Sequence, residues 1–581
     1  MRYRLFAVAM AGSSLCLAQT KDHPNVIIIL TDDQGFGDLS FNCNPYLKTP
    51  AIDKLARQSV RLNNFYVCPV SAPTRSGLMT GRYSLRTGIR DTYNGGAIMA
   101  SGELTLAEIL KKEGYTTGIF GKWHLGDNYP SRPVDQGFDE SLTHLGGGMG
   151  QVGDITTWFR KDSSYFDPVL WHNGKQEKHT GYCSDIFSDE AINFIEKNHQ
   201  SPFFCYLAFN APHTPLQVPG KYYDKFRDID PSAGLKNEEI PFPAMNEQDK
   251  EDARKVYAMV ANIDENLGKL LSKLDELKIA DNTLVIFMTD NGPQQRRFIA
   301  GMRGLKGSVY RGGIRVPCFV RYPAEIKGNA DIEANTAYID ILPTVADICH
   351  AELPSDRVID GRSILPLLKG NSDEFKNRPL FFYWSRKYPE LYNNIALQMG
   401  DYKLVGHTGY DSEINEFELF NIAEDPFEQT NILNEKTDTA HELKAELDKL
   451  FKELVSSPNL SDPPRTVLGT EHENPVFLSR NDADGERGIW DQEEIHGKWR
   501  VRFTEGAYNI KFRFLKPLVS NGQMMLETRS FINQKINIEE QAIEIEMNGI
   551  HFPEMECDLV PYYLVNSKSI FPFWVEVERI K

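Results

Sequence analysis

Hydrophobic runs typical of buried strands alternate with segments of helical spacing between residues 25 and 323. Strands that are apolar at nearly every position are buried on both faces, as in a parallel or mixed sheet covered by helices. Residues 253–277 carry apolar side chains at helical spacing and predict a helix. The pattern therefore predicts an α/β fold with a large mixed β-sheet sandwiched by helices. The clearest strand runs are 26–30, 117–120, 203–209 and 283–288.

The pattern changes after residue 377, where short strands precede a helix predicted at 439–454. This indicates a smaller antiparallel sheet with one helix, a subdomain over 378–455. Residues 456–475 are rich in Ser, Asn, Pro and Asp and predict a linker. Beyond it, apolar and polar residues alternate, which is typical of half-exposed antiparallel strands. We expect an accessory domain resembling a β-sandwich over 476–581, after an α/β domain over 19–377.

Polar and charged residues follow each of the four apolar runs. Open α/β sheets bind their ligands beyond the carboxyl ends of the strands. Helix capping or turn formation would explain each group separately, but a shared site explains all four together. The residues are Asp32 and Asp33 after the first run, Lys122 and His124 after the second, His213 after the third, and Asp290 and Asn291 after the fourth.

The carboxylates and the amide in this set indicate a metal site. Asp32, Asp33, Asp290 and Asn291 offer mainly oxygen donors, which suit Ca²⁺ or Mg²⁺ and not zinc. Asp-Asp and Asp-Asn-Gly also form turns, so neither pair alone identifies a metal ligand. Only His124 and His213 follow strands, which argues against a site with two zinc ions.

Length and charge limit the classes of protein. A chain of 581 residues is too long for one compact core, and 41% apolar with 25% charged residues describes an ordinary globular protein. A formal net charge of −17 argues against nucleic acid as a partner. An anionic substrate would have to be held by a local basic pocket.

The N-terminus resembles a secretory signal peptide. Positive residues up to Arg4 precede an apolar core at 5–17, and Cys16-Leu17-Ala18 resembles a cleavage site. This core is too short to span a bilayer, and no later run is long enough for a transmembrane segment. We expect residues 1–18 to be removed and the protein to be exported. A buried N-terminal helix and a lipid on Cys16 are the alternatives.

Four motifs occur in the order found in one enzyme family. Residues 71–82, SAPTRSGLMTGR, resemble the first sulfatase signature, and 114–124, GYTTGIFGKWH, the second. Residues 305–317 and 418–428 resemble two further family segments, with Arg311 where many relatives carry Glu. Taken alone, residues 71–82 are also typical of the start of a helix. The chain from about 25 to 454 thus resembles the formylglycine-dependent sulfatases of the alkaline phosphatase superfamily, Ser-type and arylsulfatase-like.

The resemblance implies a mechanism and its residues. Ser71 would be oxidised to formylglycine, whose hydrate attacks sulfur and binds Ca²⁺ together with the four oxygen donors. Each role has a structural alternative, such as a salt bridge for Arg75. The other implied residues are Arg75, which fixes the hydrate, Lys122 and Lys306, which bind sulfate oxygens, His124, which assists elimination, and His213, which binds substrate and protonates the leaving alcohol.

The encoded serine implies how the enzyme matures. In relatives, serine at this position is oxidised by an anaerobic sulfatase-maturating enzyme, whereas aerobic maturation uses cysteine. The resemblance therefore implies an anaerobic bacterium and a periplasmic or secreted enzyme. Such sulfatases act on sulfated glycans, and we expect exo action at a terminal residue.

Substrate choice is expected in three segments: 146–181, the stretch after Asn291, and 86–94. Trp158, Tyr165, Trp171 and His172 could contact sugars, but closing a long loop onto the core explains them slightly better. The C-terminal domain could bind glycan, but its Trp490 and Trp499 are at least as well explained as core residues. We therefore interpret this domain as a structural lid.

Two other functions compete with this interpretation. A phosphatase or phosphodiesterase of the same superfamily would use Ser71 directly, and an inactive homologue would only bind sulfated glycans. The complete set of predicted catalytic residues argues against the inactive homologue.

Overall fold

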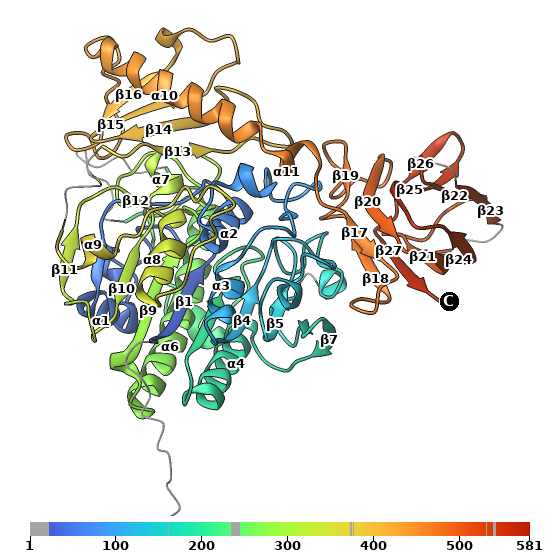
Figure 1. Ribbon diagram of the computed structural model, residues 1–581, viewed down its shortest axis with the longest axis horizontal. Helices are drawn as coiled ribbons and strands as arrows, with labels where there is room; N and C mark the ends of the chain where they lie inside the picture. Colours follow the sequence, from blue (N-terminus) through green and yellow to red (C-terminus); the bar gives the residue numbers. More distant parts are fainter. Residues whose placement is uncertain are drawn as a thin grey trace, which may run out of the picture.

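The computed structural model describes residues 23–160, 162–233, 244–371, 375, 377–529, 532–538 and 542–580. The predicted signal peptide lies outside these ranges. The centre of the molecule is a ten-stranded mixed sheet in the order β11-β2-β10-β9-β1-β8-β4-β5-β6-β7 (Figure 1). Its strands are β1 Asn25–Thr31, β2 Val60–Leu62, β4 Thr116–Lys122, β5 Glu140–His144, β6 Val169–His172, β7 Lys175–Lys178, β8 Phe203–Ala208, β9 Thr283–Thr289, β10 Cys318–Arg321 and β11 Ala330–Ile332.

The five strands that matter for the site, β9, β1, β8, β4 and β5, are parallel neighbours. Strand β10 runs antiparallel to β9, which makes the sheet mixed. Because the carboxyl ends of parallel strands share one edge of a sheet, the segments that follow these five strands meet there.

Strand β1 is buried along its whole length, and its side chains alternate between two hydrophobic cores. Val26, Ile28 and Leu30 belong to one core, and Ile27 and Ile29 belong to the other. This alternation is the period of two of a β-strand, and it confirms the predicted sheet with helices on both faces.

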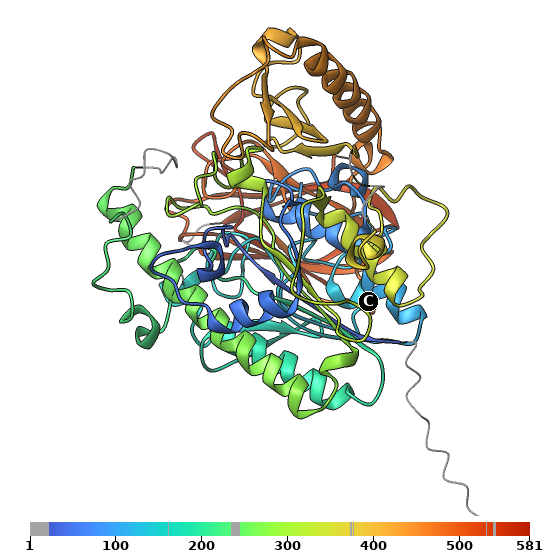
Figure 2. The ribbon, with the colours of Figure 1, turned by 90° about the vertical axis from the view of Figure 1, so that its left-hand side faces the viewer.

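Helices cover both faces of the sheet, and the long helix α6 crosses one of them (Figure 2). Helix α6 begins before the predicted 253, because Asn246 and Asp249 form a capping box at its N-terminus. Helices of the first core include α2 Ser71–Thr80, α3 Leu106–Lys112 and α8 Ile341–Ile348, and those of the second include α1 Pro50–Gln58, α4 Cys183–Asn198 and α6 Glu247–Glu276.

The C-terminal subdomain is a four-stranded antiparallel sheet covered by one helix, as predicted. It continues the core of the α/β domain, because buried residues of both form one hydrophobic cluster. Its elements are β13 Leu380–Tyr383, β14 Ile395–Met399, β15 Tyr402–Gly406, β16 Glu418–Asn421 and α10 Thr437–Val455.

The C-terminal β domain projects to one side of the body (Figure 1). It contains two sheets, in the orders β17-β20-β25-β22-β23, with β19 and β26 attached, and β18-β27-β21-β24. The strands are β17 Thr466–Leu468, β18 Val476–Ser479, β19 Asp484–Gly485, β20 Gly497–Phe503, β21 Gly506–Arg513, β22 Gly522–Glu527, β23 Asn533–Ile538, β24 Glu544–Phe552, β25 Met555–Val565, β26 Lys568–Ile570 and β27 Trp574–Arg579.

The segment predicted as a linker is part of this domain and of its attachment. Residues 456–475 contain α11 Pro458–Ser461, and β17 pairs in parallel with β20. The linker was predicted from the Pro and Ser content of the segment. The short run Thr466-Val467-Leu468 nevertheless forms a strand, because β-branched residues favour strands, and Leu468 is fully buried.

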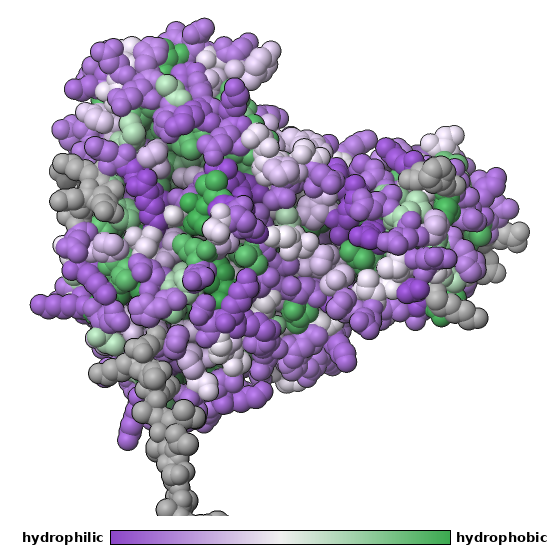
Figure 3. Space-filling model, in the orientation of Figure 1, coloured by the Kyte–Doolittle hydropathy of each residue, from purple (hydrophilic) through white to green (hydrophobic). Residues whose placement is uncertain are grey.

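The face of the molecule seen in Figure 3 is mostly hydrophilic, and hydrophilic residues interrupt its apolar ones. Within the described residues, no helix is long and apolar enough to cross a membrane. The seven cysteines of the described residues are all unpaired.

Candidate active site at the carboxyl edge of the sheet

The residues predicted to form one site lie together at the carboxyl edge of the sheet. Asp32 and Asp33 follow β1, Asp290 and Asn291 follow β9, and all four are completely buried. The sheet brings them together because β1 and β9 pair in register, with Thr31 opposite Thr289. Lys122, the last residue of β4, is buried beside them, and Ser71, Arg75, His124, His213 and Lys306 complete the predicted set.

Ser71 is the first residue of α2, and its hydroxyl lies at the centre of the cluster. Lys122 Nζ and Arg75 Nε donate to Ser71 Oγ at 3.1 and 3.2 Å. The hydroxyl also contacts the carboxylates of Asp290 and Asp32. Val70, the residue before the helix, gives no side-chain cap, and a helix N-terminus favours an anion. An anionic group can therefore be held at residue 71.

Lys122 is held in a buried ion pair whose Nζ lies 2.5 Å from Asp32 Oδ2. Burial lowers the pKa of Lys122 to about 8, with Asp32 opposing this effect. Burial alone would raise the pKa of Asp32, but Lys122 and His213 outweigh it and keep the pKa below its usual value. The strand reaches this position through Gly121, where a Cβ would lie 1.8 Å from the carbonyl oxygen of Ala208. Only glycine fits there.

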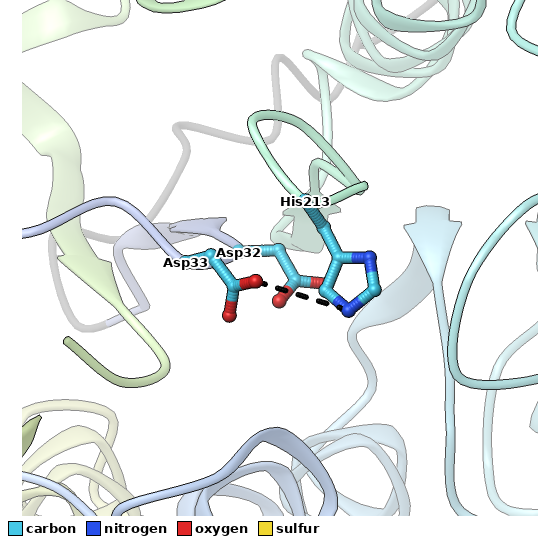
Figure 4. A group of neighbouring side chains, drawn as sticks. All are labelled: Asp32, Asp33 and His213. Atoms are coloured by element: carbon cyan, nitrogen blue, oxygen red, sulfur yellow. Dashed lines mark ion pairs between the residues drawn. The ribbon is translucent and has the colours of Figure 1, made fainter. Parts of the chain in front are cut away.

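Asp33 lies between Lys306 and His213. Lys306 Nζ lies 2.6 Å from Asp33 Oδ1. On the other side, His213 Nε2 lies 3.8 Å from Asp33 Oδ2 (Figure 4). Burial alone would raise the pKa of Asp33, but Lys306 and His213 hold it below its usual value. Its backbone is left-handed, with φ of 61°, a conformation that non-glycine residues seldom adopt and that clusters at functional sites.

The residues present fit a hard divalent cation. Asp33 Oδ2 and Asn291 Oδ1 are buried acceptors without a hydrogen-bond partner, although buried polar atoms are nearly always paired. Asp32, Asp33 and His213 each place one potential ligand atom within 4.8 Å of the others. With Asp290 adjacent, the donor set is dominated by oxygen, as Ca²⁺ and Mg²⁺ prefer. The predicted metal site is therefore supported by unsatisfied oxygens.

Three histidines lie around the cluster, and the sequence indicated two of them. His213 Nδ1 lies 2.7 Å from the Thr214 carbonyl, and His124 Nε2 lies 2.8 Å from the Thr92 carbonyl. A carbonyl only accepts, so these nitrogens carry the protons and leave His213 Nε2 and His124 Nδ1 as acceptors. Burial lowers the pKa of both rings, and that of His124 falls well below its usual value.

His144, the third histidine, corrects the expectation that only His124 and His213 follow strands. It is the last residue of β5 and is buried, and its Nε2 lies 3.0 Å from Asn210 Oδ1. The short run Glu140–His144 was not recognised as a strand because it is less apolar than the other four. His144 does not line the cavity described below and is best explained as support for the loop that carries His213.

A cavity of about 560 Å³ opens above Ser71. All three segments expected to choose the substrate contribute to it, through Gly147 and Gln151, through Gln294, and through Thr92 and Tyr93. A larger cavity of about 730 Å³ lies elsewhere, and none of the predicted catalytic residues lines it. The sequence did not indicate three residues that also line the cavity over the site: Trp384, Arg386 and Arg487. Trp490, which the sequence left open as a glycan contact or a core residue, lines the cavity as well.

The four residues of 146–181 considered for sugar contact do not line this cavity in the described structure. Trp158 packs on Phe573 and Trp171 on Phe477, so both attach the loop to the C-terminal β domain. The remaining two support the loop itself: the Tyr165 hydroxyl donates to the His213 carbonyl at 2.7 Å, and His172 pairs with Glu177.

Comparison with known proteins identifies the family. Residues 24–351 match the family model described as "Sulfatase", which is more than half of the chain. The chain belongs to the sulfatase family. Residues 305–456 of this sulfatase match a second model, "N-sulphoglucosamine sulphohydrolase, C-terminal", across the subdomain with the four-stranded sheet. The protein is therefore a sulfuric ester hydrolase of the alkaline phosphatase superfamily, as the motifs predicted.

Three relatives show how far the similarity extends. The sulfatase is 28% identical to mouse N-acetylgalactosamine-6-sulfatase, over 68% of this chain and 74% of the relative. It is 26% identical to N-acetylglucosamine-6-O-sulfatase of Bacteroides thetaiotaomicron, over 79% of this chain and 91% of the relative. A crystal structure of Ps i-CgsB in complex with k-i-k-neocarrahexaose matches with a TM-score of 0.63 and 29% identity, over 76% of this chain and 94% of that one.

Proposed function

We propose that this sulfatase hydrolyses a sulfate ester on a sulfated glycan, by exo action, after conversion of Ser71 to formylglycine. The observation that carries the proposal is the position of Ser71 Oγ, on which Arg75, Lys122, Asp32 and Asp290 converge. Once converted, residue 71 would supply the hydrated aldehyde as nucleophile. A plain serine sulfate ester could not be cleared by elimination, which is why the encoded residue is a precursor.

Each neighbour has a role that follows from its place. Arg75 would orient residue 71, while Lys122 and Lys306 would bind sulfate oxygens and stabilise the charge of the transferring group. His213 lines the cavity, and in its protonated form it would donate the Nε2 proton to the leaving sugar alcohol. His124, with Nδ1 available, would take the proton from the second hydroxyl of the hydrate.

The metal would be Ca²⁺, with Mg²⁺ as the alternative, held by Asp32, Asp33, Asp290, Asn291 and residue 71. When bound, it would neutralise sulfate oxygens and lower the pKa of the hydroxyl nucleophile.

A glycan substrate is supported by the relatives and by the cavity. Two relatives are named for sulfated amino sugars, and the Ps i-CgsB structure holds a hexaose. The cavity volume falls within the range of about 300–1,000 Å³ that small-molecule sites occupy. We further propose export to the periplasm or medium of an anaerobic bacterium, from the N-terminal pattern, and maturation by an anaerobic sulfatase-maturating enzyme, from the encoded serine.

The deciding test is the mass of the peptide around residue 71, in protein made anaerobically with its native maturation enzyme. We expect Ser71 to lose two hydrogens, and sulfate release from a panel of sulfated saccharides to follow the converted fraction. The Ser71→Ala protein is the matched control and should release none. Sulfate release by protein whose Ser71 is entirely unmodified would contradict the proposed mechanism.

A further inference from the structure

The cavity over Ser71 is lined by four cationic residues, and no carboxylate is among the described residues that line it. This is notable in a chain of net charge −17. Lys122 and Lys306 are paired with the aspartates of the metal site. Arg386 pairs with Asp91 at 3.1 Å but is half exposed, and Arg487 makes no hydrogen bond or ion pair with any part of the chain that the structure describes.

Three aromatic side chains line the cavity next to these arginines: Tyr93, Trp384 and Trp490. The Tyr93 and Trp490 rings lie 5.7 Å apart, and the Arg386 guanidinium lies 5.0 Å from the Tyr93 centroid and 4.8 Å from that of Trp384. Trp490 Nε1 is buried without a hydrogen-bond partner. Aromatic faces bury the apolar face of a sugar ring, and an indole N–H can donate to a sugar oxygen.

The loop that carries Arg487 and Trp490 is fixed in place, although it belongs to the C-terminal β domain. Gly485 and Asn94 exchange two hydrogen bonds, at 2.7 and 3.3 Å, which tie the loop to the α/β domain. Arg480 donates to the carbonyls of Ile489 and Gln492 at 3.1 and 2.6 Å. The loop is therefore held over the cavity by both domains.

Binding of the scissile sulfate does not require the two arginines. That group belongs beside Ser71, where Lys122 and Lys306 are available. A second cavity of about 660 Å³ shares Arg386, Arg487, Tyr93 and Trp384 with the first, so the groove continues past the arginines. Asp91, the partner of Arg386, and Glu390 line this second cavity as well. Guanidinium groups form paired hydrogen bonds with carboxylates and with tetrahedral oxyanions, which makes an unpaired arginine there a site for another anion.

We propose that loop 486–492 of the C-terminal β domain is part of the substrate site, and that Arg487, with Arg386, binds a second anionic group of the glycan. This group is a carboxylate or a sulfate that the enzyme does not remove, and Trp490 and Tyr93 cover the sugar ring that bears it. The inference rests on the proposed glycan sulfatase function. It changes the expected role of the C-terminal domain from a structural lid to a part of the specificity site.

Calorimetric binding to the full-length protein with unconverted Ser71 tests the inference without any turnover. The probes are matched pairs that differ by one anionic group. Two pairs compare a 6-O-sulfated amino sugar with its 2-N,6-O-disulfated form, one pair for glucosamine and one for galactosamine. A third pair compares a sulfated uronic-acid disaccharide whose carboxyl group is free with the same disaccharide whose carboxyl group is reduced. We expect the dianionic member of at least one pair to bind at least tenfold more tightly. The pair that shows this ratio identifies the second anion as sulfate or carboxylate.

Arg487→Gln should reduce that ratio to less than threefold without changing the melting temperature, because Arg487 has no partner within the described structure. Arg502→Gln is the matched control, since Arg502 lies on β20 of the same domain and pairs with Glu554. A ratio near one in the wild type, a ratio that survives Arg487→Gln, or no binding to any probe would overturn the inference. Failure of the proposed function would appear separately, as unmodified Ser71 and no sulfate release in maturation-competent cells.

Discussion

Arg75 donates to the same oxygen of Asp290 twice, from Nε at 3.1 Å and from Nη2 at 2.8 Å. The two residues are 215 positions apart and both side chains are buried. The pair joins the first turns of α2 to the end of β9, and so it fixes Ser71 against the metal site. Breaking a buried ion pair by removing one partner leaves an uncompensated charge in the interior.

Arg75→Met should therefore lower the free energy of unfolding by about 3–5 kcal/mol and abolish sulfate release. Urea unfolding of the unconverted protein measures the first effect. The matched control is Arg57→Met, because Arg57 pairs with Asp53 from an exposed position and should contribute about 1 kcal/mol or less. Equal destabilisation by the two variants would contradict the structural role given to Arg75.

Calcium should stabilise the protein, because Asp33 Oδ2 and Asn291 Oδ1 are buried acceptors without a donor. We expect removal of Ca²⁺ with EGTA to lower the melting temperature and stop turnover, and added Ca²⁺ to restore both. At a Ca²⁺ concentration 100 times Kd, the stabilisation is about 2.7 kcal/mol.

Asn291→Ala should weaken this response to Ca²⁺. Asp331→Asn, which changes a half-exposed carboxylate paired with Arg61 on the outermost strand, should leave the response intact. A melting temperature of the wild type that does not respond to EGTA or Ca²⁺ would rule out a calcium site.

His213 should matter in proportion to the basicity of the leaving group. A sugar alkoxide needs a proton as it leaves, whereas an acidic phenol does not, so His213→Ala should lower kcat for a glycan sulfate by about 10²–10⁴-fold. The loss with an activated aryl sulfate should be much smaller. His172→Ala, on an exposed hairpin and paired with Glu177, is the control. The same loss on both substrates would show that His213 is not the general acid.

The contact between Asp127 and Asp482 should make stability depend on pH. Asp127 lies in the α/β domain and donates its backbone N–H to Asp482 Oδ2 at 3.0 Å. Burial raises the pKa of Asp482 to about 6, and burial together with Asp482 raises that of Asp127 well above its usual value. The folded state then binds more protons than the unfolded state above about pH 4, so stability falls as pH rises through this window.

We expect the melting temperature and the free energy of unfolding to fall between pH 5 and pH 8. Asp482→Asn should reduce the fall in the free energy of unfolding by an amount on the order of 2 kcal/mol. Asp154 and Glu473, which lie near Asp127 and whose pKa values burial also raises, will keep part of the dependence. Asp462→Asn, at an exposed position, is the control. An unchanged pH profile in Asp482→Asn would refute the assignment of this pH dependence to Asp482.

The amino-acid sequence alone determined the sheet, the family and the predicted site. Runs such as 26–30 are apolar at every position because both faces of the strand are covered, and this pattern is local. The residues that follow these runs lie together because the strands are parallel. The sequence alone therefore indicated that Asp32, Lys122 and Asp290 share one site. Their catalytic roles stay predictions that rest on the family resemblance.

Only the tertiary structure decided what surrounds that site. Arg386 and Arg487 belong to different domains and lie about 100 positions apart, and neither is part of a motif or of a periodic pattern. Likewise, no local signal shows that Trp490 lines a cavity while Trp499, nine positions later, is buried in a core. The physical reason is that the burial of a strand selects the residues of that strand, so the pattern is visible in a short stretch of sequence. The lining of a pocket depends instead on how segments far apart in the sequence pack against one another, and no short stretch of sequence encodes that packing.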